Sequence, residues 1–98
     1  MSVTPAQCRA ARGLLGWSQA ELAASSKVAV KTIADFERGS RTPYPRTLED
    51  ILEALEAAGV IFLAEGEGTD GGPGVRLERS IGDDFSISGD QLNASNDD

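Results

Sequence analysis

The chain has 98 residues, the size of one domain, and 40% of them are hydrophobic, which is enough for one modest core. It carries 16 acidic and 9 basic residues, one cysteine and no histidine, for a net charge of −7. A lone cysteine excludes an internal disulfide, and a chain without histidine is not expected to hold zinc or a Ser-His or Cys-His catalytic pair. No apolar run could cross a bilayer, and the first residues lack an export pattern, so we expect a soluble, cytoplasmic protein that does not contact membranes.

The charges are unevenly distributed along the chain. Residues 1–46 contain seven basic and three acidic residues and carry a net charge of +4. Residues 47–63 carry −4 and residues 64–98 carry −7. A basic first half is compatible with a polyanion partner even though the whole chain is acidic.

The first helix is expected to begin after Thr4, because a Thr cap, Pro5 in the first turn and Gln7 at the third position form a capping box. Its buried stripe is predicted to comprise Cys8, Ala11, Leu15 and Leu14. We interpret Cys8 as buried filler rather than a redox switch, and Trp17 as a lid over the core rather than a base-stacking residue.

Two short helices follow, separated by a tight break. Ser18 and Glu21 form a second capping box, and the apolar residues of that helix are Ala20, Leu22 and Ala23. Residues 25–27 break the pattern. Val28, Ile33 and Phe36 then give the next helix an apolar stripe, and Gly39 stands where a helix end favours a left-handed residue.

This stretch resembles the helix-turn-helix of the Xre/Cro family of bacterial and phage regulators. The matching residues are Ser18-Gln19-x-Glu21-Leu22-Ala23 and Thr32-Ile33-x-x-Phe36-Glu37-x-Gly39, and the resemblance covers about residues 4–58. It implies a mainly α domain of four to five helices that binds double-stranded DNA. A bare packing unit with the same helices is the alternative.

In this fold the helix at residues 28–38 would enter the major groove. The residues then expected to face bases are Ala29, Val30, Lys31, Thr32, Ala34 and Asp35. Lys31 would bond guanine, Asp35 would accept from cytosine, and Ala29 and Val30 would meet a thymine methyl.

The sequence departs from the family pattern at two positions. Lys27 stands where glycine is usual, which affects the turn. Ala29 stands where a Ser or Thr cap is usual, which costs about 1 kcal/mol unless another group substitutes.

The resemblance also places Gln19 against the DNA backbone. The expected phosphate neighbours are Ser18, Gln19, Lys27, Arg38, Arg41 and Thr42, the last two in a loop stiffened by two prolines. In the family an arginine like Arg12 commonly pairs with a glutamate like Glu37, so we expect a structural ion pair there rather than DNA contacts.

A fourth helix is predicted to begin at Pro45 or Thr47 and to run to about residue 58. Its core stripe comprises Leu48, Ile51, Leu52 and Leu55. Its outer face carries Glu49, Asp50, Glu53 and Glu56, which phosphate would repel, so we expect this face to point away from DNA. We interpret these carboxylates as surface charges and not as acid/base catalysts.

Two strands are expected at residues 60–64 and 75–79, joined by a glycine-rich turn; a subset of Xre-like regulators resembles this arrangement. A lone hairpin is marginally stable, and its apolar run would expose Ile61 and Phe62. We therefore predict that the hairpin holds a homodimer; packing onto its own helices is the alternative. The predicted dimer residues are Val60, Ile61, Phe62, Leu63, Val75 and Leu77.

The sequence thus predicts three parts: a DNA-binding domain at residues 1–58, a dimerisation element at 59–79, and an acidic tail at 80–98. Within the tail, residues 85–88 would form a brief strand or bind a protein partner, and the carboxylates would fold over the basic half. The predicted function is that of a homodimeric repressor that binds an inverted repeat, with no metal and no cofactor. An antitoxin-like module that binds a protein partner is the rival, and an enzyme is the weakest alternative.

Overall fold

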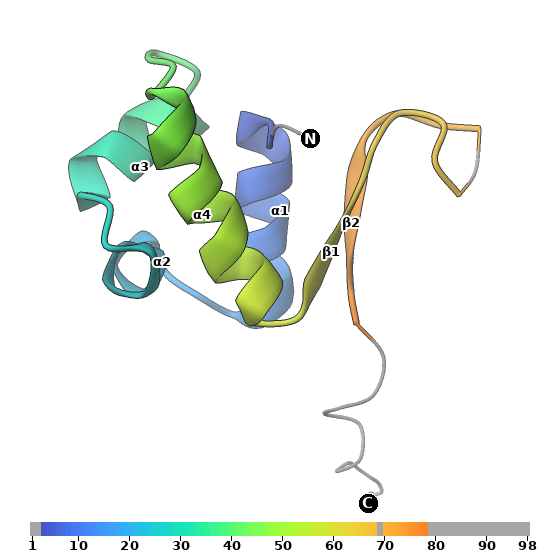
Figure 1. Ribbon diagram of the computed structural model, residues 1–98, viewed down its shortest axis with the longest axis horizontal. Coiled ribbons are helices and arrows are strands. Elements are labelled where there is room, and N and C mark those ends of the chain that lie inside the picture. Colours follow the sequence, from blue (N-terminus) through green and yellow to red (C-terminus); the bar gives the residue numbers. More distant parts are fainter. Residues whose placement is uncertain (1–2, 69, 79–98) are drawn as a thin grey trace, which may run out of the picture.

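In a computed structural model of the chain, which describes residues 3–68 and 70–78, four helices precede a two-stranded antiparallel sheet (Figure 1). The elements are α1 (Pro5–Leu15), α2 (Gln19–Ser26), α3 (Val30–Glu37), α4 (Pro45–Ala57), β1 (Val60–Leu63) and β2 (Gly74–Leu77). The predicted mainly α class with a terminal strand pair is confirmed. Helices α1 and α4 form the middle of the molecule, with α2 and α3 on one side and the hairpin on the other (Figure 1).

Both predicted capping boxes form. The Thr4 hydroxyl accepts from the Gln7 amide at 3.0 Å, and the Thr4 amide donates to Gln7 Oε1 at 3.0 Å. At α2 the Ser18 hydroxyl accepts from the Glu21 amide at 3.1 Å, while Glu21 Oε1 accepts from the Ser18 amide at 2.8 Å. These bonds satisfy amides that a helix start leaves without partners, so sequence alone located both starts.

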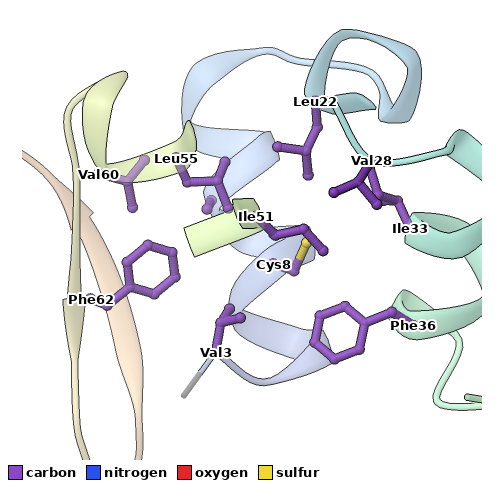
Figure 2. Close-up of a cluster of buried hydrophobic side chains, with 11 residues drawn as sticks. Val3, Cys8, Leu22, Val28, Ile33, Phe36, Ile51, Leu55, Val60 and Phe62 are labelled. Carbon is purple, nitrogen blue, oxygen red and sulfur yellow. The ribbon is translucent and has the colours of Figure 1, made fainter. Parts of the chain in front are cut away.

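The core runs through the middle of the molecule, with side chains from all four helices and from β1 (Figure 2). Of the helices, α1 and α4 contact the sheet, and α2 and α3 pack on the opposite side. Its largest fully buried side chains are Leu22, Ile33, Ile51, Leu55 and Cys8. Leu48 and Leu52 on α4 and Trp17 before α2 pack against this cluster while partly exposed. The predicted α4 stripe and the lid position of Trp17 are therefore confirmed.

Two helix positions differ from the expected faces. Leu14 is 42% exposed, because α1 turns it away from the side on which Cys8 and Ala11 are buried. Ala20 is exposed, whereas Leu22 and half-buried Ala23 face the core. On a helix with a narrow buried face, apolar residues off the main stripe remain in solvent.

The hairpin packs one face onto its own helices. Val60 pairs with Leu77 and Phe62 with Val75 across the two strands. Val60 and Phe62 are 3% and 7% exposed, so the expectation that Phe62 needs cover from outside is wrong; the helices supply it (Figure 2). Ile61 alternates to the other face and is 37% exposed.

Gln7 attaches the hairpin to α1. Its side chain is buried, and Nε2 donates to the carbonyl oxygens of Leu63 at 3.2 Å and Gly74 at 3.0 Å, one on each strand. The same residue also completes the α1 capping box through Oε1. Its polar atoms are thus bonded despite burial, which removes the cost of burying them.

In the part of the chain that the structure describes, no helix has the length and apolarity needed to traverse a bilayer. The acidic segment at residues 80–98, including the strand or partner site expected at 85–88, lies outside the described residues.

Candidate nucleic-acid interface

The turn between α2 and α3 is made by Lys27. This residue adopts a left-handed conformation with φ of 62°, the conformation that the usual glycine would take without strain. Its amide donates to the Ala23 carbonyl at 2.9 Å. Ser26 supports the turn, because its hydroxyl donates to the Leu22 carbonyl at 2.7 Å and accepts from the Val28 amide at 3.3 Å. The lysine therefore keeps the turn geometry at a conformational cost.

Helix α3 has one buried side and one open side. Ile33 and Phe36 are buried in the core, while Val30 is 43% exposed and the Lys31 side chain is 82% exposed. Ala29, the residue before the first turn, is exposed and makes no side-chain cap, and Thr32 and Ala34 are half-buried at the edges. The structure therefore leaves the predicted base-facing residues 29–31 accessible.

Asp35 is placed differently from the expectation that it is exposed. The residue is 9% exposed, and each of its carboxylate oxygens holds a cation. Oδ2 accepts from Lys31 Nζ at 3.2 Å, and Oδ1 accepts from Arg38 Nη2. The Asp35 side chain is shielded from solvent because its position on α3 is next to the buried residues Ile33 and Phe36.

Glu37, at the end of α3, joins three helices in a cluster that we name by its members Cys8, Arg12, Gln19 and Glu37. Arg12 binds both carboxylate oxygens, as the family resemblance implied. Gln19 Nε2 donates to Oε1 at 2.9 Å, and the Cys8 thiol donates to Oε2 at 3.1 Å. The backbone carbonyl of Glu37 accepts from Arg9.

The cluster shifts the ionisation of its members. Burial alone would raise the pKa of Glu37, but hydrogen bonds from Arg12, Gln19 and Cys8 outweigh it, and the net effect lowers the pKa of this carboxyl. The hydrogen bond to Glu37 raises the pKa of Arg12. Burial, the hydrogen bond to Glu37 and its negative charge raise the pKa of the Cys8 thiol. Cys8 is thus a neutral, buried side chain, in line with the sequence interpretation.

Gln19 has a second role besides the expected phosphate contact. One N–H of its amide is occupied by Glu37, which orients the half-buried side chain at the start of α2. An amide nitrogen carries two N–H groups, so one remains for a phosphate. The position of this residue at a helix start matches that use.

The expected phosphate neighbours lie before α2, in the turn before α3 and in the segment after α3. Ser18, Lys27, Arg38, Arg41 and Thr42 are all exposed. Between the starts of α3 and α4 lies a hollow of about 330 Å³, which is lined by Lys27, Val28, Ala29, Thr32, Arg41, Pro43, Tyr44, Thr47 and Asp50. Lys27 and Arg41, which belong to two separate loops, therefore line the same hollow. Their separation in the sequence does not predict this proximity.

Tyr44 is a residue that the sequence analysis missed. It is 77% exposed and lines the same hollow as Lys27 and Arg41. The sequence did offer a signal for it, an aromatic residue between Pro43 and Pro45. The two prolines stiffen the loop, so little backbone entropy is lost when the Tyr44 side chain contacts a ligand.

The predicted dimer residues lie together on the hairpin, across the helices from α3 (Figure 1). They divide into buried Val60 and Phe62, half-buried Leu63 and Val75, and exposed Ile61 and Leu77. The predicted base-facing residues of α3 and the predicted dimer residues of the hairpin therefore lie on separate parts of the molecule.

Comparison with known proteins gives one family and no curated relative. The profile of the family described as Helix-turn-helix matches residues 9–57, half of the chain. A search of curated proteins finds no match. The matched span contains most of α1 and all of α2, α3 and α4, which includes the turn at Lys27 and the whole Glu37 cluster except Cys8. This domain binds DNA and is not catalytic. The chain therefore belongs to the Xre/Cro-type helix-turn-helix family of DNA-binding proteins.

Proposed function

We propose that this protein is a homodimeric transcriptional repressor that reads an inverted-repeat operator. Residues 1–58 bind DNA, residues 59–79 hold the dimer, and residues 80–98 form an acidic tail. Two copies of α3 enter major grooves on one face of the duplex, with half-site centres about 10–10.5 base pairs apart or a multiple of that. Repression follows from occupying DNA that polymerase needs, in the cytoplasm where the chromosome lies.

The observation that carries this proposal is the open side of α3. Val30 and Lys31 are exposed there. Lys27 and Arg41 line one hollow with Ala29 and Thr32, and Arg38 shares the Asp35 carboxylate with Lys31. Of the α4 carboxylates, Glu49 and Glu53 are exposed on a different helix, but half-buried Asp50 lines the same hollow as Lys27 and Arg41, so the expectation that all of them point away from the proposed DNA surface is wrong for Asp50. Base reading then rests on Ala29, Val30, Lys31, Thr32 and Ala34 at the major-groove edges, with few hydrogen-bonding side chains, so DNA shape contributes to preference.

The proposed dimer contact uses the exposed apolar side chains of the hairpin. Val60 and Phe62 pack onto the helices, whereas Ile61, 37% accessible, lies on the opposite face beside Arg76. Leu77 shares the face of its partner Val60 but is 47% accessible at the end of β2. A second copy covering Ile61 and Leu77 would remove apolar area from water. Two-fold symmetry of that contact would match the symmetry of an inverted repeat.

The test is a random-duplex binding selection at two salt concentrations, together with a mass measurement of the free protein. We expect an inverted repeat, a dimer mass, and an affinity that falls roughly 10³–10⁵-fold between 50 and 200 mM salt, as for proteins with 6–10 phosphate contacts. Recovery of no preferred sequence from a protein that binds duplex would refute specific reading.

Point variants separate the two kinds of contact. Lys31→Ala should relax preference at one base pair, whereas Gln19→Ala should weaken binding to all sequences alike. Glu53→Gln, on the exposed side of α4, is the control for altered net charge. A uniform loss from both Lys31→Ala and Gln19→Ala would show that the reading face is misplaced.

The dimer has its own variant. Ile61→Lys should shift the free protein toward monomer and weaken operator binding, because each half-site is then bound alone. Retention of the dimer mass would place self-association elsewhere.

The exposed apolar side chains of the hairpin favour one alternative function. An antitoxin-like protein would use Ile61, Leu77 and the acidic tail to bind a second protein while its helices bind DNA. Purification from the native host with a stoichiometric small protein, lost on Ile61→Lys, would favour that alternative.

A further inference from the structure

Asp35 lies on the recognition helix α3 but is poorly placed to touch DNA. Only 12% of its side chain is accessible, compared with 82% for Lys31 and 63% for Arg38. Each carboxylate oxygen is bonded, Oδ2 to Lys31 Nζ at 3.2 Å and Oδ1 to Arg38 Nη2. A direct base contact would require this short side chain to give up both partners.

The two cations are the residues that the proposed function places on DNA in different roles. Lys31, one turn before Asp35, is the base-reading lysine, and Arg38, one turn after it, is a phosphate neighbour. One carboxylate therefore joins the reading group and an anchoring group along a single helix side. The backbone of Asp35 is also held, because its carbonyl accepts from the Ser40 amide at 3.0 Å and from the Ser40 hydroxyl at 3.2 Å.

We propose that Asp35 is a positioning residue that sets base preference through Lys31. The proposal rests on the DNA-reading function given above and deepens it. A free lysine has several rotatable bonds and reaches neighbouring bases and phosphates equally well. The contact at 3.2 Å with a buried, doubly held carboxylate favours conformations of exposed Lys31 that run along the Asp35 side of α3.

The negative charge of Asp35 has a second consequence. It offsets one cation on the face that meets the duplex, which lowers attraction to phosphates of any sequence. Preference for one base and weak general binding then come from the same carboxylate. Specificity is the difference between these two affinities, so both effects increase it.

The test is Asp35→Asn, which keeps the shape and removes the charge. Binding is measured by fluorescence anisotropy on the selected duplex and on a set in which each base pair is replaced in turn. We expect loss of about tenfold in discrimination at the base pair that Lys31→Ala also relaxes, which is the lower range for one side chain–base contact. General binding should tighten, and the slope of log affinity against log salt should steepen by up to about 1 per half-site, for one cation released to phosphate.

The double variant Lys31→Ala with Asp35→Asn decides the mechanism. If Asp35 acts through Lys31, the double variant discriminates bases no worse than Lys31→Ala alone. If Asp35 accepts directly from a cytosine, Asp35→Asn will abolish preference at a different base pair, in the Lys31→Ala background too, and the inference is overturned.

Controls separate positioning from loss of fold and of charge. Glu53→Gln removes one negative charge, as Asp35→Asn does, but from an exposed side chain on α4, so it should leave base preference unaltered. Asp35→Glu keeps the charge but moves it by one methylene, so it should weaken base preference with little change in salt dependence, whether or not Asp35→Asn folds. Wild-type protein with no base preference would refute the proposed function, whereas full preference in folded Asp35→Asn and Asp35→Glu would refute only this inference.

Discussion

Arg12 and Glu37 form a bidentate ion pair that ties α1 to the end of α3. Arg12 Nε lies 2.8 Å from Oε2 and Nη2 lies 2.7 Å from Oε1, and the glutamate side chain is 3% exposed. A third donor of the same guanidinium, Nη1, reaches the Trp17 carbonyl at 3.0 Å, so the pair also holds the start of the α2 segment. The orientation of α3 relative to α1 thus depends on a largely buried charge pair.

Loss of the arginine alone should be severe. Arg12→Met leaves the Glu37 carboxylate buried without its cation, and breaking a buried pair in this way costs about 3–5 kcal/mol. Urea denaturation measures the change in the free energy of unfolding. The double variant Arg12→Met with Glu37→Met should recover most of the loss, because no buried charge then remains. A double variant as unstable as the single one would contradict this account.

The lowered pKa of Glu37 predicts a dependence of stability on pH. Because the folded pKa is below the unfolded value of about 4.3, the unfolded chain takes up the proton more readily. The stabilisation is fully present above that value and is lost as pH falls through the folded pKa. The difference in free energy of unfolding between wild type and Glu37→Gln should therefore be largest at neutral pH and shrink below about pH 4.3.

Urea denaturation from pH 7 to pH 3 measures that difference. Glu53→Gln serves as its control, since this side chain is exposed and belongs to no described ion pair. If the difference in the free energy of unfolding between wild type and Glu37→Gln stayed constant from pH 7 to pH 3, ionisation of Glu37 would not stabilise the fold.

Lys27→Gly should stabilise the fold while weakening DNA binding. A non-glycine residue at φ of 62° costs about 1 kcal/mol, which glycine avoids, so thermal denaturation should show a higher midpoint. Loss of the cation should lower affinity for every duplex. Lys27→Ala is the matched control, because it loses the same charge but keeps the strain; equal midpoints for Gly and Ala would contradict the argument.

Ala29→Ser should stabilise the start of α3. Ala29 has extended backbone angles (φ −61°, ψ 141°) but no oxygen to accept the free amides of the first turn, and a serine cap is worth about 1 kcal/mol. Chemical denaturation measures the resulting change in the free energy of unfolding. Ala20→Ser is the control, because Ala20 lies within α2 with its side chain exposed. This change should be slightly destabilising, since serine is a poorer helix former than alanine. No gain at Ala29 would mean that another group already satisfies these amides.

Much of the fold followed from local rules in the sequence. Both capping boxes, the stop at Gly39 and the α4 stripe depend on residues within a few positions of one another, so their spacing is enough to predict them. The Arg12–Glu37 pair came from the family resemblance, since no local rule relates residues 25 positions apart.

By itself, the sequence determined the starts of α1 and α2, the helix-turn-helix and the segregation of charge, because capping, periodicity and composition act over short distances. The third helix, expected at residues 28–38, spans Val30–Glu37, because Val28 and Ala29 form the turn before it. Only the tertiary structure decided that Phe62 packs onto its own helices, that Asp35 is buried between two cations, and that Gln7 bonds both strands. These outcomes depend on how elements far apart in the chain pack against each other. A side chain at the margin of a stripe is buried or exposed according to its neighbours in space, which the order of residues does not specify.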